Sequence, residues 1–223
     1  MHIPDGFIDI KTSAAFAAAS ALAVAGAVKG ARRQLSEQSA PLAGLTAVFI
    51  FAVQMLNFPV AAGTSGHLIG AALAMVLVGP YAATLALVVV LIIQAFLFAD
   101  GGLTALGLSI FNMAVISVWV SFAVFMLLMK IFPKTKSWLV IATFVSALIS
   151  VPAAAVGFVI QYAIGANATF SVGAVLNAMV GTHILIGIGE AIITALTVSA
   201  VLASRSDLVF GWDKKNTTLE IRS

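Results

Sequence analysis

The sequence contains no cysteine and few charged residues, and each absence removes a class of protein. Of its 223 residues, 62% are hydrophobic and only 9% are charged. Soluble domains carry about a quarter charged residues, so the composition indicates an integral membrane protein instead. The lack of cysteine excludes disulfides, thiolate metal sites and iron–sulfur clusters.

Several catalytic motifs are also missing. The sequence has no Gly-x-x-x-x-Gly-Lys-Ser/Thr loop for ATP, no His-Glu-x-x-His zinc motif and no Gly-x-Ser-x-Gly nucleophile turn. The last long apolar run, residues 172–203, contains no lysine that could form a retinal Schiff base. We therefore expect a transport or receptor protein rather than an enzyme.

Long apolar runs bounded by charge, proline or glycine make up most of the chain. We interpret them as seven membrane-spanning helices in a single domain over residues 1–223, ending in a tail at 204–223. The predicted spans are Thr12–Ala31, Leu42–Phe58, His67–Gly79, Tyr81–Ala99, Leu106–Ile131, Trp138–Ile164 and Val172–Ala203. The third is short, about 20 Å at 1.5 Å per residue, and Gly79-Pro80 ends it.

The basic residues predict which way the helices face. With Met1 outside, inner segments hold ten of the eleven basic residues: Lys29, Arg32, Arg33, Lys130, Lys134, Lys136, Arg205, Lys214, Lys215 and Arg222. Only Lys11 breaks the positive-inside rule. We expect an all-α, seven-transmembrane-helix bundle with the N-terminus outside and the C-terminus cytoplasmic.

The opening stretch, Met1-His-Ile-Pro-Asp-Gly6, contains donor atoms that could chelate a metal ion. It lacks the pattern of a secretory leader, so we expect a free Met1 amine beside His2. The amine, the His2 amide nitrogen and His2 Nδ1 can close a five-membered and a six-membered chelate ring. These three nitrogens lie nearly in one plane, which suits Ni²⁺ or Cu²⁺ once the amide proton is lost. Residues 1–11 are therefore a candidate metal-binding segment.

His67 is the candidate for the fourth position of that plane. It follows Gly63-Thr-Ser-Gly66, where Thr64 or Ser65 would cap a helix and put His67 in its first turn. The positive end of a helix disfavours imidazolium, which would keep His67 neutral and able to bind metal. The alternative is equally open: His67 forms an ordinary loop hydrogen bond and His2 is an unremarkable terminal residue.

Other polar residues fall on the same predicted outer face. Asp5 either orients a ligating imidazole or belongs to a solvated turn. Gln54 and Asn57 share a helix face and either line a site or, as we favour, tie helices together. Asp100, in Ala99-Asp-Gly-Gly102, has an open role in which turn formation is favoured.

His183 and Glu190 share one face of the last predicted helix, Glu190 near mid-membrane. An intramembrane carboxyl is a candidate proton relay, but we favour a structural bond to a neighbouring helix. Ser146, Ser150 and Gln161 are the candidate partners.

The motifs together resemble a known family. Met1-His-Ile-Pro-Asp-Gly-Phe7, Gln54-Met-Leu-Asn-Phe-Pro59, Gly63-Thr-Ser-Gly-His67, Phe98-Ala-Asp-Gly-Gly-Leu-Thr-Ala105 and Phe111-Asn-Met113 resemble the nickel/cobalt substrate-binding (S) components of energy-coupling factor (ECF) transporters, the CbiM/NikM family. The similarity extends through His183-x6-Glu190. The opening and the Gly-Thr-Ser-Gly-His block are specific in combination.

The resemblance implies a function and a set of partners. Met1, His2 and His67 would hold Ni²⁺ or Co²⁺, the transported substrate, in an external four-nitrogen square plane. The chain would work in a prokaryotic cell membrane with a transmembrane T component, two ATPase subunits and a small accessory membrane subunit. The competing interpretation is a stand-alone secondary transporter or channel for a small polar solute or another divalent metal, for which only Glu190 could couple protons or sodium.

Overall fold

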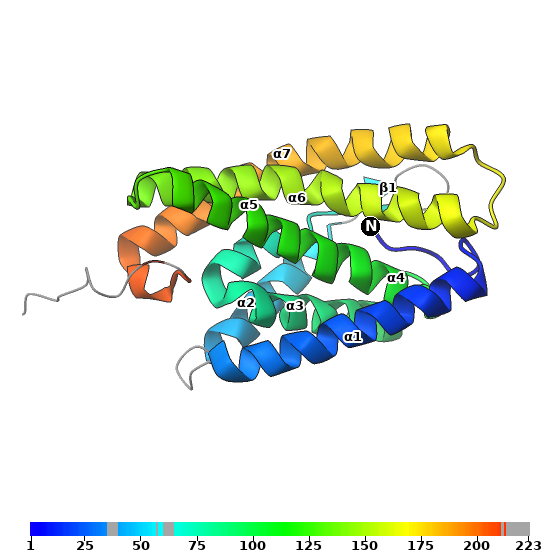
Figure 1. The fold of residues 1–223 in the computed structure, drawn as a ribbon, viewed down its shortest axis with the longest axis horizontal. Helices are drawn as coiled ribbons and strands as arrows, with labels where there is room; N and C mark the ends of the chain where they lie inside the picture. The colour runs from blue at the N-terminus through cyan, green and yellow to red at the C-terminus, as the bar shows by residue number, and fades with distance from the viewer. Residues whose placement is uncertain (35–39, 57, 60–64, 211, 213–223) are drawn as a thin grey trace, which may run out of the picture.

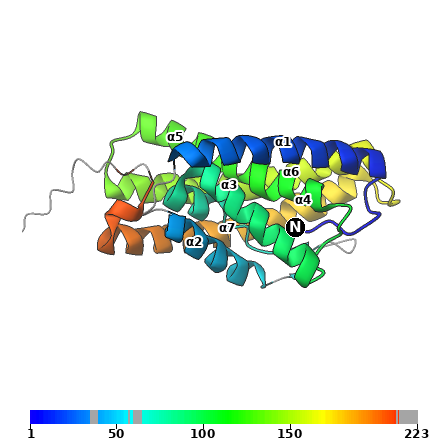
Figure 2. The same cartoon turned by 90° about the horizontal axis from the view of Figure 1, so that it is seen from below.

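The computed structural model describes the chain except for residues 35–39, 57, 60–64, 211 and 213–223. In order, the helices are α1 (Ile10–Gln34), α2 (Ala40–Gln54), α3 (Ala71–Leu97), α4 (Leu106–Ile110), the π-helix η2 (Phe111–Ile116), α5 (Ser117–Ile131), α6 (Lys136–Gly165), α7 (Val172–Ser204) and the 3₁₀ turn η3 (Ser206–Leu208). Strands β1 (Phe58–Pro59) and β2 (Ser65–Gly66) pair antiparallel. Figures 1 and 2 show the long helices lying roughly along one common axis.

Five helical stretches in the described part of the chain are long and apolar enough to cross a membrane. They are α1, α3, the continuous run from α4 through η2 to α5, α6 and α7. The apolar helix α2 is shorter, at 15 residues. The described part of the chain thus has six apolar helical stretches, five of them long enough to cross a membrane, and the predicted seven separate spans are not confirmed. The difference arises because the predicted third and fourth spans both belong to α3.

The backbone of α3 turns sharply at the predicted break. Gly79 has φ 81° and ψ 165°, a conformation outside the helical region that glycine adopts without a Cβ clash, and Pro80 follows it. Before this kink, the Val76 carbonyl accepts a hydrogen bond from Phe210 N, beyond the end of α7. After it, the chain leads from Tyr81, packed against Gly30 near the end of α1, to the loop that contacts the first residues. Gly79-Pro80 therefore interrupts the helical backbone where the sequence predicts a break, although the segments on both sides share the label α3.

α3 is the central helix, with most of its apolar window buried. It packs against α1, α2, α5, α6 and α7, and α6 packs against α7. The π-helix η2, between α4 and α5 in the chain, packs against α6, where Asn112 Nδ2 donates to Gln161 Oε1 at 2.7 Å. The hydroxyls of Ser146 and Ser150 donate to carbonyls of α6 itself. The expectation that these three α6 side chains bond to Glu190 is therefore wrong.

The first nine residues fold back into the bundle instead of extending from it. Met1 and Ile3 are completely buried and belong to the hydrophobic core. In Figures 1 and 2 the chain start lies among the helices, well away from the start of α1. This burial puts the terminal amine inside the protein.

Candidate metal-binding site

Two sets of main-chain hydrogen bonds fix the amino-terminal segment in its buried position. At the end of α6, Asp9 N donates to Gly165 O at 2.7 Å, and Asn167 N donates to Phe7 O at 3.1 Å. At the loop after α3, Gly102 N donates to Ile3 O at 2.8 Å. These hydrogen bonds leave little freedom for Met1 and His2, whose side chains are 0% and 5% exposed.

Glycines in the loop after α3 allow it to approach the segment closely. Gly101 has φ +92°, and a Cβ there would lie 3.0 Å from the Cβ of His2. A Cβ on Gly102 would collide with the main chain of Asp5. A larger residue at either position would push the loop away from His2.

His2 and His67 come together in the core although 65 positions separate them in the sequence. Their rings stack with centroids 4.8 Å apart and an angle of 29° between the planes. His67 is completely buried. Its Nδ1 bonds the Leu68 carbonyl at 2.8 Å, and because a carbonyl only accepts, Nδ1 carries the hydrogen. Nε2 is then the lone-pair nitrogen, and it has no hydrogen-bond partner among the described residues.

His67 does not lie in the first turn of a helix, contrary to the sequence-based prediction. β2 ends at Gly66 and α3 begins at Ala71, so His67 belongs to the extended connection between them. The N-cap of α3 is Gly70, with φ 77° and no side-chain cap. Ser65 lies in β2, and Thr64 is outside the described residues. The cap prediction failed because a carboxylate from a distant helix bonds this helix start instead.

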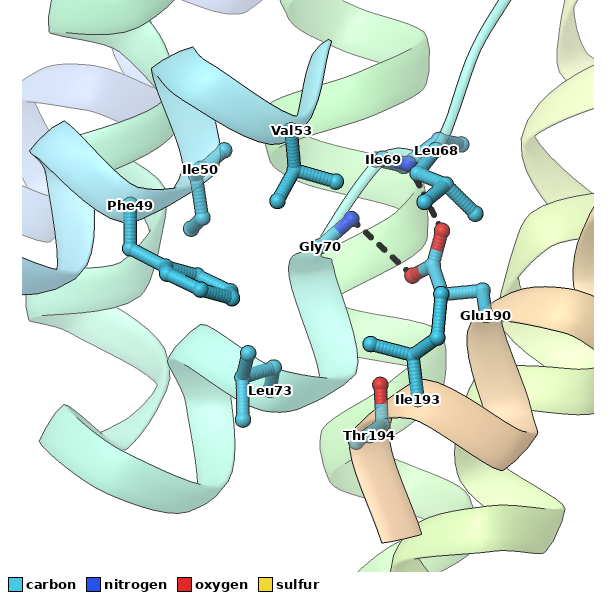
Figure 3. A pocket seen from close by; sticks show the side chains of 10 residues that line it. All are labelled: Phe49, Ile50, Val53, Leu68, Ile69, Gly70, Leu73, Glu190, Ile193 and Thr194. Carbon is cyan, nitrogen blue, oxygen red and sulfur yellow. Dashed lines mark hydrogen bonds between the residues drawn. The ribbon is translucent and has the colours of Figure 1, made fainter. Parts of the chain in front are cut away.

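That carboxylate belongs to Glu190 on α7. Its oxygens accept hydrogen bonds from Ile69 N at 2.6 Å and from Gly70 N at 3.0 Å (Figure 3). The favoured structural role of Glu190 is thus correct, but its partners are main-chain amides at the start of α3. Gln54 supports the same connection, because its Nε2 donates to Ile69 O at 2.8 Å. The interpretation of Gln54 as a tie between segments agrees with this bond, whereas Asn57 lies outside the described residues.

Burial keeps the candidate ligands neutral. It lowers the pKa of the Met1 amine from 8.0 to about 4, although the nearby Asp100 charge acts in the opposite direction. Burial, followed by the charge of the Met1 amine, holds the pKa of His2 well below 6.5. The pKa of His67 is also well below 6.5, chiefly because of burial. Neutral nitrogens are what a metal ion requires of its ligands.

Asp5 and Asp100 both line an open pocket next to His2, but they have different partners. Asp100 Oδ2 lies 3.4 Å from His2 Nε2. This is the ring nitrogen that stays free of the metal if Nδ1 is the chelating atom. Asp5 contacts no imidazole. Its Oδ1 accepts hydrogen bonds from the Thr104 amide and hydroxyl, which lowers the pKa of this exposed carboxyl. The arrangement suggested for Asp5 is therefore found at Asp100.

The third histidine of the sequence, His183, also lies in the protein interior. It is fully buried on α7, and its Nδ1 donates to Met179 O at 2.7 Å. It is near enough to interact electrostatically with His67 and with the Met1 amine. The His183-x6-Glu190 spacing was visible in the sequence, but nothing local indicated that this helix face meets the chain start.

The donors gathered here are mainly nitrogens. In the described part of the chain, no three His, Cys, Asp or Glu side chains lie close enough together to hold one metal ion. What converges is one main-chain amine and two stacked imidazoles. This set can bind a borderline transition-metal ion if the main chain supplies nitrogen as well.

Comparisons with known proteins agree on a class. The family model described as "Cobalt uptake substrate-specific transmembrane region", CbiM, matches residues 2–208. A putative metal transport protein of Haloquadratum walsbyi is 39% identical over 94% of each chain. A putative fused nickel transport protein NikMN of Archaeoglobus fulgidus is also 39% identical, over 94% of this chain and 68% of its own length.

A solved structure supports the same assignment. A crystal structure titled as a transition metal transporter superposes with a TM-score of 0.84 at 30% identity, covering 91% of this chain and 93% of its own. The relatives are transport proteins, and the apolar helices are those of a multi-pass prokaryotic membrane protein. The chain belongs to the CbiM family and is a component of nickel/cobalt transport.

Proposed function

We propose that this chain is the substrate-binding (S) component of an ECF transporter and captures Ni²⁺ or Co²⁺ at an external four-nitrogen site. The observation that carries the proposal is the stacking of His2 on His67 beside a buried, neutral Met1 amine. Burying an amine and two imidazoles is costly, and His67 Nε2 has no hydrogen-bond partner among the described residues to offset that cost. A bound transition-metal ion would satisfy all of these nitrogens together.

The four ligands follow from the chemistry of the donors. The Met1 amine, the deprotonated His2 amide and His2 Nδ1 form two fused chelate rings. Asp100, facing His2 Nε2, holds the hydrogen on that nitrogen and leaves Nδ1 for the metal. His67 Nε2 supplies the fourth nitrogen, its other nitrogen being occupied by Leu68 O.

The donor set favours certain metals over others. Four nitrogens in a plane suit Ni²⁺, and Co²⁺ is an accessible second substrate. Zn²⁺ prefers a tetrahedral site, and Mg²⁺ and Ca²⁺ prefer oxygen ligands. Protonation of the His2 amide would collapse the chelate and release the metal.

The orientation and the partners complete the proposal. The amino terminus faces outward, because most basic residues then lie in the cytoplasm. Gly79-Pro80 divides α3 into two spans of opposite direction, which would restore seven spans and put the tail inside. Since the sequence has no P-loop, ATP hydrolysis resides in two ATPase subunits, joined through a transmembrane T component and a small accessory membrane subunit.

The decisive experiment is metal analysis of the purified protein with an untagged amino terminus. One nickel or cobalt ion per chain, with a spectrum of planar nitrogen coordination, is the expected result. A chain that binds neither metal would contradict the proposal. Uptake by the chain alone in liposomes, without ATP or partners, would favour the alternative, a stand-alone secondary transporter or channel.

A further inference from the structure

His183 on α7 carries a buried nitrogen with no hydrogen-bond partner in the described part of the chain. The side chain is 0% exposed, and its Nδ1–H is bonded to Met179 O. The imidazole is therefore held in one tautomer with a lone pair on Nε2, which is left unpaired. Buried polar atoms are rarely left without a partner, so this nitrogen calls for an explanation.

His183 lies on a helix that takes no part in the open pocket beside His2. That pocket is lined by His2, Pro4, Asp5 and residues 99–102, and no residue of α7 lines it. α7 instead contacts β2, directly before His67. His183 also lies near enough to His67 and the Met1 amine to interact with them electrostatically.

Further along the same face of α7 lies a narrow crevice. Glu190, Ile193 and Thr194 of α7 line it (Figure 3). The other lining residues are Phe49, Ile50 and Val53 of α2, residues 68–70 before α3, and Leu73 of α3. A lone-pair nitrogen is thus found on the helix face that also lines this mostly apolar crevice. An ion moving inward along α7 would find few other polar atoms in the crevice, apart from Glu190 and Thr194.

His183 does not complete the site that holds the metal at rest. No three side chains of the ligating types lie within reach of a single ion in the described residues, so His2, His67 and His183 do not bind one ion together. A ligand outside the resting site but next to it is suited to a transfer step.

We propose that His183 Nε2 is the first ligand on the inward path and receives the metal from the four-nitrogen plane. The proposal rests on the function inferred above. In the transfer, a bond from the metal to His183 Nε2 forms as its bond to His67 Nε2 breaks. A water molecule gives a proton back to the His2 amide and leaves as hydroxide, and the metal keeps its 2+ charge. Ligand exchange through a neighbouring imidazole avoids a bare ion in an apolar interior.

The test separates binding from transfer with two substitutions. His183→Asn keeps an N–H at the position of Nδ1, so the bond to Met179 O is retained while the Nε2 lone pair is lost. His183→Gln is the second variant, in case the asparagine variant does not fold. Both are compared with wild type for nickel affinity of the isolated chain, thermal unfolding, and ATP-driven nickel uptake by the complete transporter in liposomes.

The expected result is a nickel dissociation constant within about threefold of wild type and uptake at saturating nickel reduced about tenfold or more. Wild-type uptake in a folded His183 variant would overturn the inference and leave the proposed function intact. Loss of nickel binding by a folded variant would also overturn it, because His183 would then belong to the resting site. Failure of the wild-type chain to bind nickel would instead contradict the proposed function.

Discussion

His2 and His67 lie face to face in the protein core, with ring centroids 4.8 Å apart. The two residues reach this position from separate supports. Main-chain bonds to the end of α6 and to the loop after α3 hold the segment containing His2, whereas Glu190 and Gln54 hold the connection after His67. Each prediction below removes one ligand or one of these supports.

Replacing His67 with alanine should abolish high-affinity nickel binding. Loss of a residue that only orients a ligand costs about 10–100-fold in metal affinity, so loss of a direct ligand should cost about 100-fold or more. Calorimetric titration of the purified chain measures this. If the His67→Ala variant binds nickel with wild-type affinity, the fourth nitrogen ligand comes from another residue. Lys11→Ala, exposed at the start of α1, is the control and should bind normally.

Adding a single residue before Met1 should also abolish binding. The extension converts the amine into an amide, and Met1 is 0% exposed, so the added residue has no space. The matched control carries an extension that a protease removes completely, and cleavage should restore binding. Equal titrations before and after cleavage would rule out the amine as a ligand.

Asp100→Asn should weaken nickel binding about 10–100-fold without unfolding the protein, because Asp100 faces His2 Nε2 at 3.4 Å. Asp9→Asn is the control. Asp9 accepts hydrogen bonds from Thr12 at the exposed start of α1 and does not approach His2, so its loss should affect only stability, by about 1 kcal/mol. Equal nickel affinities for the two variants would remove Asp100 from the site.

Lowering the pH should destabilise the metal-free chain between about pH 8 and pH 4. The Met1 amine has a pKa of 8.0 when exposed and about 4 when buried, because burial disfavours its charged form. Between these values the unfolded chain binds more protons than the folded chain, so stability rises with pH and levels off above 8. Thermal unfolding against pH checks this. A melting temperature that is constant over that range, or rises as the pH falls, would contradict a buried neutral amine.

Glu190→Gln should lower both stability and nickel affinity. Glutamine can accept one of the two main-chain hydrogen bonds, but its NH₂ group would face the other N–H, at a cost of about 1–3 kcal/mol. The connection that carries His67 would then shift. Thermal unfolding and nickel titration measure the two effects. Ser199→Ala, whose hydroxyl bonds only within the exposed part of α7, should change neither. A variant with normal affinity would show that Glu190 does not position His67.

Much of the fold could be read from the sequence because it depends on long apolar runs. α1 and the last three long stretches lie close to their predicted ranges. Gly79-Pro80 is correctly predicted as a break, because proline cannot continue the hydrogen bonds of a helix and Gly79 adopts a non-helical backbone conformation before it.

The site was predictable only where its chemistry is local. The Met1-His2 chelate follows from adjacent residues, and the Gly-Thr-Ser-Gly-His block marked His67. The roles of Asp100, Glu190 and His183 depend on contacts between segments about a hundred residues apart, as in the bond from Ile69 N to Glu190. Local capping rules favoured Thr64 or Ser65 because they consider only neighbours in the sequence.

Hydrogen bonds join both ends of the first part of α3 to α7 or to the chain just after it. Glu190 of α7 accepts a bond from Ile69 N, directly before α3, and Phe210 N, beyond α7, donates to Val76 O. His67 therefore travels with α7, while Met1 and His2 stay with the loop that contains Gly102. The two imidazoles are therefore held by different parts of the fold. If they bind a metal ion as proposed, we expect a displacement of α7 relative to that loop to separate the rings and to loosen the ion.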